Sequence, residues 1–287
     1  MRVFITGGTG FVGKHTVEEL QKHGHQVLIL SRKNPKTIFS SRRNLAFLRG
    51  DLSDIKKWQK KLAVWKPEVA FHLAWESLPD HGFEMSSKNL LQGIELVRVL
   101  SKVGCKKVVA AGSCWEYGRT SGKMSEEIDP RLTDAFSVAK VALCWLGKEA
   151  AKLSGMEFVW ARIFYVYGPG QKASSLIPYL INEKLRGALP DVKNPNGGND
   201  FIYVDDVARA LRLLIEKKTP HVIYNIGSGH ITGVREIVRV VYGKDVIKRK
   251  GRAEGFYADI RKIKKDIGWR PVTGIGMGVR EMMRAES

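Results

Sequence analysis

Three glycines near the start of the chain are the first residues whose spacing suggests chemistry. Gly7, Gly10 and Gly13 stand in "GGTGFVG", directly after the apolar run "RVFIT" and before a helical pattern. Glycines at such a turn let the backbone approach a pyrophosphate, whose charge the helix N-terminus stabilises. The motif predicts a dinucleotide site, and a glycine turn without a ligand is the alternative. The expected contacts are Gly7, Thr9, Gly10, Phe11, Val12 and Gly13.

The end of the second apolar run bears on which dinucleotide binds. NAD sites commonly offer a carboxylate to the ribose 2′-hydroxyl there, whereas a nearby arginine accommodates a 2′-phosphate. The stretch "LILSRK" provides Ser31, Arg32 and Lys33, which are two cations and no acid. The sequence therefore favours NADP, with NAD as the alternative cofactor. The competing structural interpretation is that both cations face solvent.

Alternating strands and helices must position these residues. Short apolar runs predict strands at 2–6, 26–30, 45–50, 68–74, 106–113 and 157–164. Helical patterns fall between them, near 53–63, 86–104 and 134–153, and Val12, Val17 and Leu20 supply one face of the first helix. Such alternation predicts right-handed crossovers and a doubly wound parallel sheet, an α/β fold of Rossmann-like class.

The regular alternation of strand and helix patterns ends after residue 164, which predicts a second lobe. Residues 1–164 with about 201–227 are expected to form the dinucleotide-binding domain, because "FIYVDDVARALRLLIE" and "HVIYNIGSG" look like returns to the sheet. Residues of about 165–200 and 228–287 are expected to form a smaller C-terminal substrate lobe. Two lobes make a cleft, and ligands of such folds bind beyond the carboxyl ends of the strands.

The composition limits the classes of binding partner that we expect. The chain has 287 residues and a net charge of +19, which favours anionic partners such as nucleotide phosphates or nucleic acid. Cys105, Cys114 and Cys144 lack C-x-x-C spacing, so neither a disulfide framework nor a metal site is expected. No stretch approaches the length of a membrane span and the N-terminus reads as a strand, so we expect a cytoplasmic protein without a membrane partner.

Further motifs, taken in order, give the chain a family resemblance. They are "GGTGFVG", "FHLAW", "GSCWEYG", "RIFYVYGPG", "DFIYVDDVARAL" and "ADIRKIKKDIGWRP". The chain resembles an extended short-chain dehydrogenase/reductase of the NAD-dependent epimerase/dehydratase group, whose members act on nucleotide-diphosphate sugars. The resemblance implies further cofactor contacts at Asp51, Leu52, Leu73, Ala74, Lys140 and Phe164.

The resemblance also implies a catalytic frame, and here the chain departs from it. In that family a Ser or Thr, a Tyr and a Lys do the chemistry, because a lysine one helical turn away favours phenolate and the phenol exchanges a proton with the sugar. Ser113 and Lys140 match, but "TDAFSVAK" puts Phe136 in the tyrosine's place. Three interpretations stay open: an engineered Tyr-to-Phe change, a natural enzyme with another proton donor, or a protein that has given up turnover.

Substitute donors would come from motifs that border the cleft. The candidates are Tyr117, Tyr165, Tyr167, Cys114 and Glu116. Tyr117 and Tyr167 occur where relatives have structural tyrosines, so packing is their expected role. Tyr165 stands where many relatives carry an asparagine that touches the sugar, so it could either change the hydrogen bonding there or form a bulkier wall.

The resemblance implies a set of substrate contacts as well. They are Trp75, Cys114, Tyr165, Leu176, Asn199, Arg249 and Arg252. Many relatives have an arginine before "DFIYVDD", where this chain has Asn199, so one phosphate contact could be missing. Arg249 or Arg252 is expected to supply the compensating cation.

These features predict hydride transfer at C4 of a nucleotide-diphosphate sugar. The cations at 32 and 33 favour a 4-ketoreductase that consumes NADPH, and a 4-epimerase that recycles bound NAD(P) is the alternative. "SCWEYG" lacks the Asp-Glu pair of the dehydratases. A non-catalytic nucleotide- or RNA-binding relative is the rival from another class, although no RNP motif favours nucleic acid. Apolar helices with "LLQGIELVRVL" and "AKVALCWL" predict a homodimer.

Overall fold

A parallel sheet of seven strands forms the centre of the computed structural model, which describes residues 1–33, 38–39, 43–247 and 253–286. The strand order is β11-β7-β5-β4-β1-β2-β3. The bounds are β1 Arg2–Thr6, β2 Gln26–Ser31, β3 Leu45–Arg49, β4 Val69–His72, β5 Lys107–Ser113, β7 Glu157–Ile163 and β11 Ile223–Ile226. The order reverses at β1, which pairs with both β2 and β4, and ligands of open α/β sheets bind at that point.

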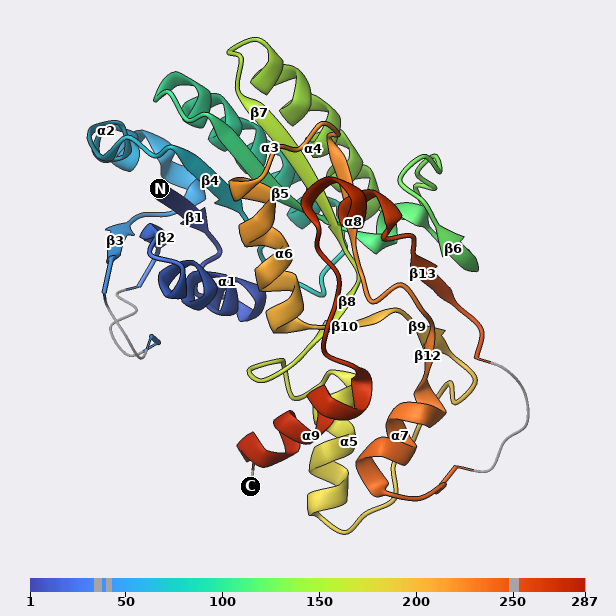
Figure 1. Ribbon diagram of the computed structural model, residues 1–287. Helices are drawn as coiled ribbons and strands as arrows, with labels where there is room; N and C mark the ends of the chain where they lie inside the picture. The colour runs from blue at the N-terminus through green and yellow to red at the C-terminus, as the bar shows by residue number, and fades with distance from the viewer. Residues whose placement is uncertain (34–37, 40–42, 248–252, 287) are drawn as a thin grey trace.

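Helices cover both faces of this sheet (Figure 1). One layer holds α1 (Phe11–Lys22), α6 (Val204–Glu216) and α8 (Arg261–Ile267), which share one apolar core with the sheet. The other layer holds α2 (Ile55–Trp65), α3 (Phe83–Lys102) and α4 (Ala135–Lys152), which share a second core. The doubly wound α/β architecture predicted from the sequence is therefore confirmed.

Helix α4 shows how the sequence sets these elements. The Asp134 carboxylate accepts a hydrogen bond from Ser137 N at 2.7 Å and so caps the helix, which fixes where it begins. Buried Phe136, Ala139 and Leu143 then recur at helical spacing and face the interior. The cap and the apolar face together hold Lys140 beneath the carboxyl end of the sheet.

Three two-stranded sheets and three helices extend this core toward the C-terminus. β8 (Tyr165–Tyr167) pairs with β10 (Phe201–Tyr203), β9 (Gly198–Asn199) with β12 (Thr232–Gly233), and β6 (Gly122–Met124) with β13 (Phe256–Ala258). The helices α5 (Leu176–Leu185), α7 (Val234–Tyr242) and α9 (Ile275–Glu286) pack around a core of their own. Of the two expected returns to the main sheet, β11 enters it, whereas β10 pairs with β8 outside it.

The C-terminal segment contributes to two of these cores. Ile263, Ile267 and Trp269 pack in the core that α1, α6 and α8 share with the main sheet, and α9 packs with α5 and α7. Among the described residues, no helix is both long and apolar enough to cross a membrane.

Candidate functional site

The glycine turn after β1 joins three parts of the fold. Gly7 has a φ of +76°, and a Cβ there would lie 2.6 Å from Ala74 N, so the turn packs directly on the loop after β4. A Cβ on Gly13 would lie 2.0 Å from Gly7 O, so α1 also packs directly on the turn. Gly10 is the N-cap of α1 and offers no side-chain acceptor, which leaves the first-turn amides for phosphate oxygens.

A cavity of about 930 Å³ opens beside this turn. The predicted cofactor residues that line it are Gly7, Thr9, Gly10, Ser31, Arg32, Lys33, Asp51, Leu52, Leu73 and Ala74. They come from the ends of four neighbouring strands, where a doubly wound fold binds its ligand. Phe11, Val12 and Gly13 form the adjacent first turn of α1. Lys140 and Phe164 are buried and do not line this cavity.

Trp75 closes the cavity on the side of the catalytic frame. It was predicted as a substrate contact, and it lines the cofactor cavity while the face of its ring covers Lys140 Nζ at 3.8 Å from the ring centroid. Its indole Nε1 is buried and has no hydrogen-bond partner among the described residues. A buried donor without an acceptor is costly, so this atom fits a site that a bound dinucleotide completes.

The end of the cavity lined by Arg32, Asp51 and Glu76 carries paired charges. Arg32 Nη1 donates to Glu76 Oε1 at 2.9 Å, and Lys88 Nζ donates to Glu76 Oε2 at 2.7 Å. Arg32 Nε also lies 3.8 Å from Asp51 Oδ2. Burial works to raise the pKa of Asp51, but the hydrogen bonds from Ser53 and the charge of Arg32 outweigh it, so the pKa lies below its usual value. Glu76 was missed from the sequence, where its one signal is its place directly after "FHLAW".

Ser113 and the Lys140 ammonium both lie near the end of β5. Ser113 N-caps the short helix η2 (Cys114–Tyr117), and Lys140 Nζ donates to Ala111 O at 2.7 Å. Burial lowers the pKa of Lys140 to about 7, against the opposing charge of Glu116. Lys140 therefore changes charge close to neutrality, and it lies two residues along the strand from the Ser113 position.

A fully buried carboxylate fixes this end of β5. Glu116 is 0 % exposed and accepts from Ser113 N at 2.7 Å, from Trp160 Nε1 at 2.9 Å and from Arg162 Nε at 2.8 Å. Burial works to lower the pKa of Arg162, but the adjacent Glu116 carboxylate raises it overall. Glu116, one of the candidate donors, is thus committed to holding Ser113 and the neighbouring strand.

An aromatic cluster surrounds Phe136. Its ring is 4 % exposed, meets the edge of Trp75 at 5.3 Å between centroids, and stacks on His81 at 4.5 Å with an interplanar angle of 13°. His81 in turn meets Trp115 edge-on at 5.5 Å. His81 lies in the loop between β4 and α3 but outside every motif, so spacing alone does not point to it.

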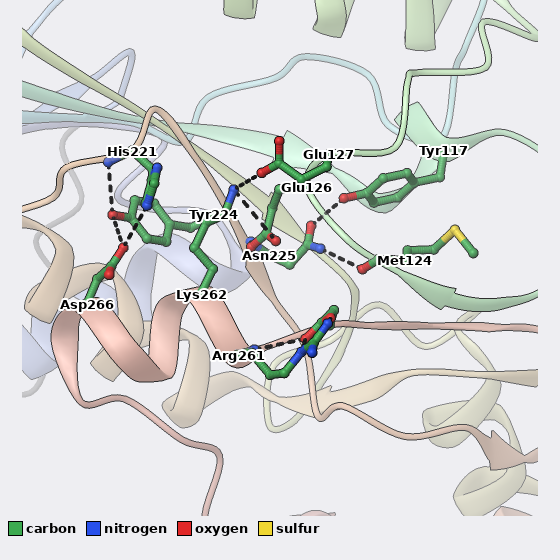
Figure 2. A network of polar contacts seen from close by, with 11 residues as sticks. Tyr117, Met124, Glu126, Glu127, His221, Tyr224, Asn225, Arg261, Lys262 and Asp266 are labelled. Atoms are coloured by element: carbon green, nitrogen blue, oxygen red, sulfur yellow. Dashed lines mark hydrogen bonds and ion pairs between the residues drawn. The ribbon is translucent and has the colours of Figure 1, made fainter.

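Of the other candidate donors, Cys114, Tyr117 and Tyr167 are buried and Tyr165 is half-buried. Burial raises the pKa of the Cys114 thiol and of the Tyr165 and Tyr167 phenols, and it raises the pKa of Tyr117 to about 12. Groups with such pKa values are poor acids or bases near neutrality. Tyr117 donates to Asn225 Oδ1 at 2.8 Å. Figure 2 shows the network around this bond, which ties the end of β11 to β6 and α8.

The predicted substrate contacts lie in several places. Tyr165 packs with Cys114 and Phe164 near Phe256, so these residues share one cluster. Leu176 begins α5, and Asn199 pairs with Thr232 across β9 and β12. Arg249 and Arg252, the predicted phosphate cations, lie outside the described residues. No group of three His, Cys, Asp or Glu side chains in the described part of the chain could hold a metal ion.

Comparisons with known proteins agree with the fold. A model of the NAD dependent epimerase/dehydratase family matches residues 3–227. The chain is 26% identical to a putative UDP-glucose 4-epimerase of Methanocaldococcus jannaschii, over 98% of this chain and 97% of the relative. A UDP-glucose 4-epimerase from Thermotoga maritima, solved with UDP-glucose, is 24% identical and has the same fold, with a TM-score of 0.87 over 99% of this chain and 98% of that one. MoeE5, solved with UDP-glucuronic acid and NAD, is 28% identical with a TM-score of 0.83, over 99% of this chain and 98% of that one.

Proposed function

Because the chain belongs to the NAD-dependent epimerase/dehydratase family, we propose that it inverts C4 of a nucleotide-diphosphate sugar as a 4-epimerase. The family assignment confirms the resemblance predicted from the sequence motifs. One observation carries the proposal: a cavity with a phosphate-binding glycine turn ends at Trp75, and the ring of Trp75 contacts Lys140 of the catalytic frame. The names of relatives that match nearly the whole chain support epimerisation as the reaction.

Each group of residues in the site has its own role in this proposal. A bound nicotinamide supplies a reversible hydride acceptor. The turn from Gly7 to Gly10 and the start of α1 bind the pyrophosphate, and Asp51 and Leu52 line the adenosine end. Ser113 orients the sugar hydroxyl by a hydrogen bond. Lys140, with its pKa near 7, places a charge or a neutral amine beside the reacting atoms according to pH.

The cofactor preference is NADP in this proposal. Ser31, Arg32 and Lys33 line the cavity where an NAD site usually has a carboxylate, and both cations suit a 2′-phosphate. The Arg32 side chain is 68% exposed and so can reorient. Glu76 opposes this preference because it already pairs with Arg32, so the advantage of NADP is expected to be modest. Titration with NADPH and NADH measures it directly.

A 4-ketoreductase is the second candidate, and Arg32 and Lys33 are the observation that favours it. A net reductase consumes NADPH, whereas an epimerase returns its hydride to the sugar. The two are separated by two incubations of the chain, one with a UDP-hexose and a trace of NADP, the other with a 4-keto nucleotide sugar and NADPH. Appearance of the C4 isomer without net change in NADPH supports the epimerase, and oxidation of NADPH in proportion to a supplied 4-keto sugar supports the reductase.

We also propose that two copies pair through α3 and α4, which pack against each other. Apolar side chains remain exposed on these helices: Leu91 at 67%, Val138 at 48%, Trp145 at 49% and Leu146 at 50%. Val138, Trp145 and Leu146 are seven and eight residues apart and so share one helix face. Light scattering after gel filtration should give the mass of two chains, and Trp145→Glu should give the mass of one. A monomer in the unaltered chain would contradict the proposal.

A further inference from the structure

We propose that His81, oriented by Asp134 and stacked on Phe136, exchanges with the sugar hydroxyl the proton that a tyrosine at position 136 would exchange. The inference rests on the proposed hydride transfer at C4. It explains how a chain with the rest of the catalytic frame can act without the phenol.

The first argument is position. Phe136 stands one helical turn before Lys140, and Lys140 Nζ lies 5.7 Å from the centroid of the Phe136 ring. His81 lies face to face with that ring, at 4.5 Å between centroids. The imidazole therefore lies face to face with the ring that stands in the place of the phenol. Phe136 supplies a flat apolar platform that fixes the imidazole plane.

The second argument is orientation. His81 Nδ1 lies 3.5 Å from Asp134 Oδ2, while Asp134 Oδ1 accepts from Ser137 N at 2.7 Å. The helix cap thus fixes the carboxylate, and the carboxylate favours the tautomer with the proton on Nδ1. Nε2 has no hydrogen-bond partner within the part of the chain that the structure describes. A histidine with one nitrogen held by a carboxylate and the other open is the arrangement of a general base.

The third argument is access. The His81 side chain is 29% exposed and its neighbour Trp115 is 41% exposed. Cys114, the alternative donor beside Ser113, is 2% exposed and burial raises its pKa. A substrate hydroxyl can therefore reach His81 more readily than the buried thiol.

The charged groups around His81 come from three elements. Asp134 at the start of α4 contacts the ring, and Lys140 of α4 lies behind Phe136. Lys172, in the segment after β8, donates to Leu78 O in the loop that carries His81. Asp80, in the same loop, accepts from Gly82 N. Of these groups Asp134 makes the direct contact with the imidazole.

The proton and the hydride leave the sugar separately. In the oxidative direction the O4–H bond breaks and its proton binds His81 Nε2. The C4–H bond breaks and its hydrogen leaves with two electrons, which a bound nicotinamide of the family's cofactor would accept, so a C4 carbonyl forms. In the reductive direction the hydride returns to C4 and Nε2–H returns its proton to O4. Phe136 takes no part in the proton transfer.

The test compares His81→Gln with His23→Gln, a control on the exposed end of α1 that lies in no part of the proposed machinery. Both variants should bind UDP-glucose without cofactor within about threefold of the unaltered chain by calorimetry. Turnover should fall on the order of 100- to 10,000-fold in His81→Gln alone, the usual contribution of a general acid or base. Asp134→Asn keeps the cap acceptor but removes the carboxylate charge beside His81 Nδ1, so it should lower turnover and change the nitrogen NMR signal of that ring.

A second readout needs no turnover. In the cofactor-free chain, nitrogen NMR of the histidine rings should show the His81 Nε2 signal shift when UDP-glucose binds. An unshifted His81 signal with bound sugar, or a His81→Gln chain that keeps turnover within threefold, would overturn the assignment of His81 while leaving the proposed function intact. An unaltered chain that binds and converts no nucleotide sugar would overturn both.

Discussion

Phe136→Tyr tests the division of labour between Phe136 and His81. The change adds one hydroxyl to a ring that is 4 % exposed and lies between His81 and Trp75. If the hydroxyl finds no partner, its burial should cost roughly 1–3 kcal/mol of folding free energy. If it points to the sugar site as a family tyrosine does, the stability cost should be small.

The expected effect on turnover depends on His81. A general acid or base contributes about 100- to 10,000-fold, and His81 already provides it in our account, so the new phenol should add less than about tenfold. In a His81→Gln background the same phenol should restore on the order of 100-fold. Its partner Lys140 has a pKa of about 7, so the rescue should fade as pH rises above 7 and the ammonium loses its charge.

The assay is steady-state turnover of one UDP-hexose by four chains: unaltered, Phe136→Tyr, His81→Gln and the double variant. Phe136→Leu is the matched control, because it removes the platform ring without adding a donor, and it should lower turnover without rescue. A gain in turnover of 100-fold or more from Phe136→Tyr alone would refute the reasoning. Position 136 would then be the place of the missing proton donor, and His81 would not take part in proton transfer.

Three further predictions concern the cofactor, the buried histidine and the buried carboxylate. Arg32→Ala should raise the Kd of NADPH by about 10-fold or more and that of NADH by less than about threefold, because it removes a charge-assisted contact to the 2′-phosphate; equal losses in fluorescence titrations would exclude that contact. Burial lowers the pKa of His72 to about 3 from 6.5, so the unfolded chain binds a proton that the folded chain does not, and the free energy of unfolding should fall as pH drops from 6.5 toward 3. Urea titrations of His72→Gln should show that its free energy of unfolding falls less steeply over this pH range. An unchanged pH dependence would contradict the role given to His72. Glu116→Gln should destabilise the fold by on the order of 3 kcal/mol in thermal denaturation, since it leaves Arg162 buried without its counter-ion; a loss below about 0.5 kcal/mol would show that the pair is not needed.

The fold was largely predictable because its signals are local. Each strand of the main sheet carries its own apolar run, and the glycine turn fixes where β1 ends and α1 begins. Strand β10 was harder to place, because its partner β8 lies more than thirty residues away and no local pattern tells which sheet it joins.

The site was predictable where backbone motifs define it. Gly7, Gly10 and Asp51 line one cavity as expected. His81 and Glu76 were not predictable, because a loop brings each to its partner through space and neither belongs to a motif. Trp75 was placed with the substrate, yet its large ring reaches both the cavity and Lys140. Side-chain reach of this kind cannot be read from spacing.

Proton NMR of UDP-glucose and UDP-glucuronic acid deuterated at C4 tests the central claim most directly. Each sugar is incubated with the unaltered chain and NADP or NAD, and both the sugar and the nicotinamide are examined. Hydride transfer at C4 predicts either a C4 isomer that keeps its deuterium or deuterium on the nicotinamide ring. Sugars that stay unchanged with both cofactors, although they bind the protein, would contradict the claim.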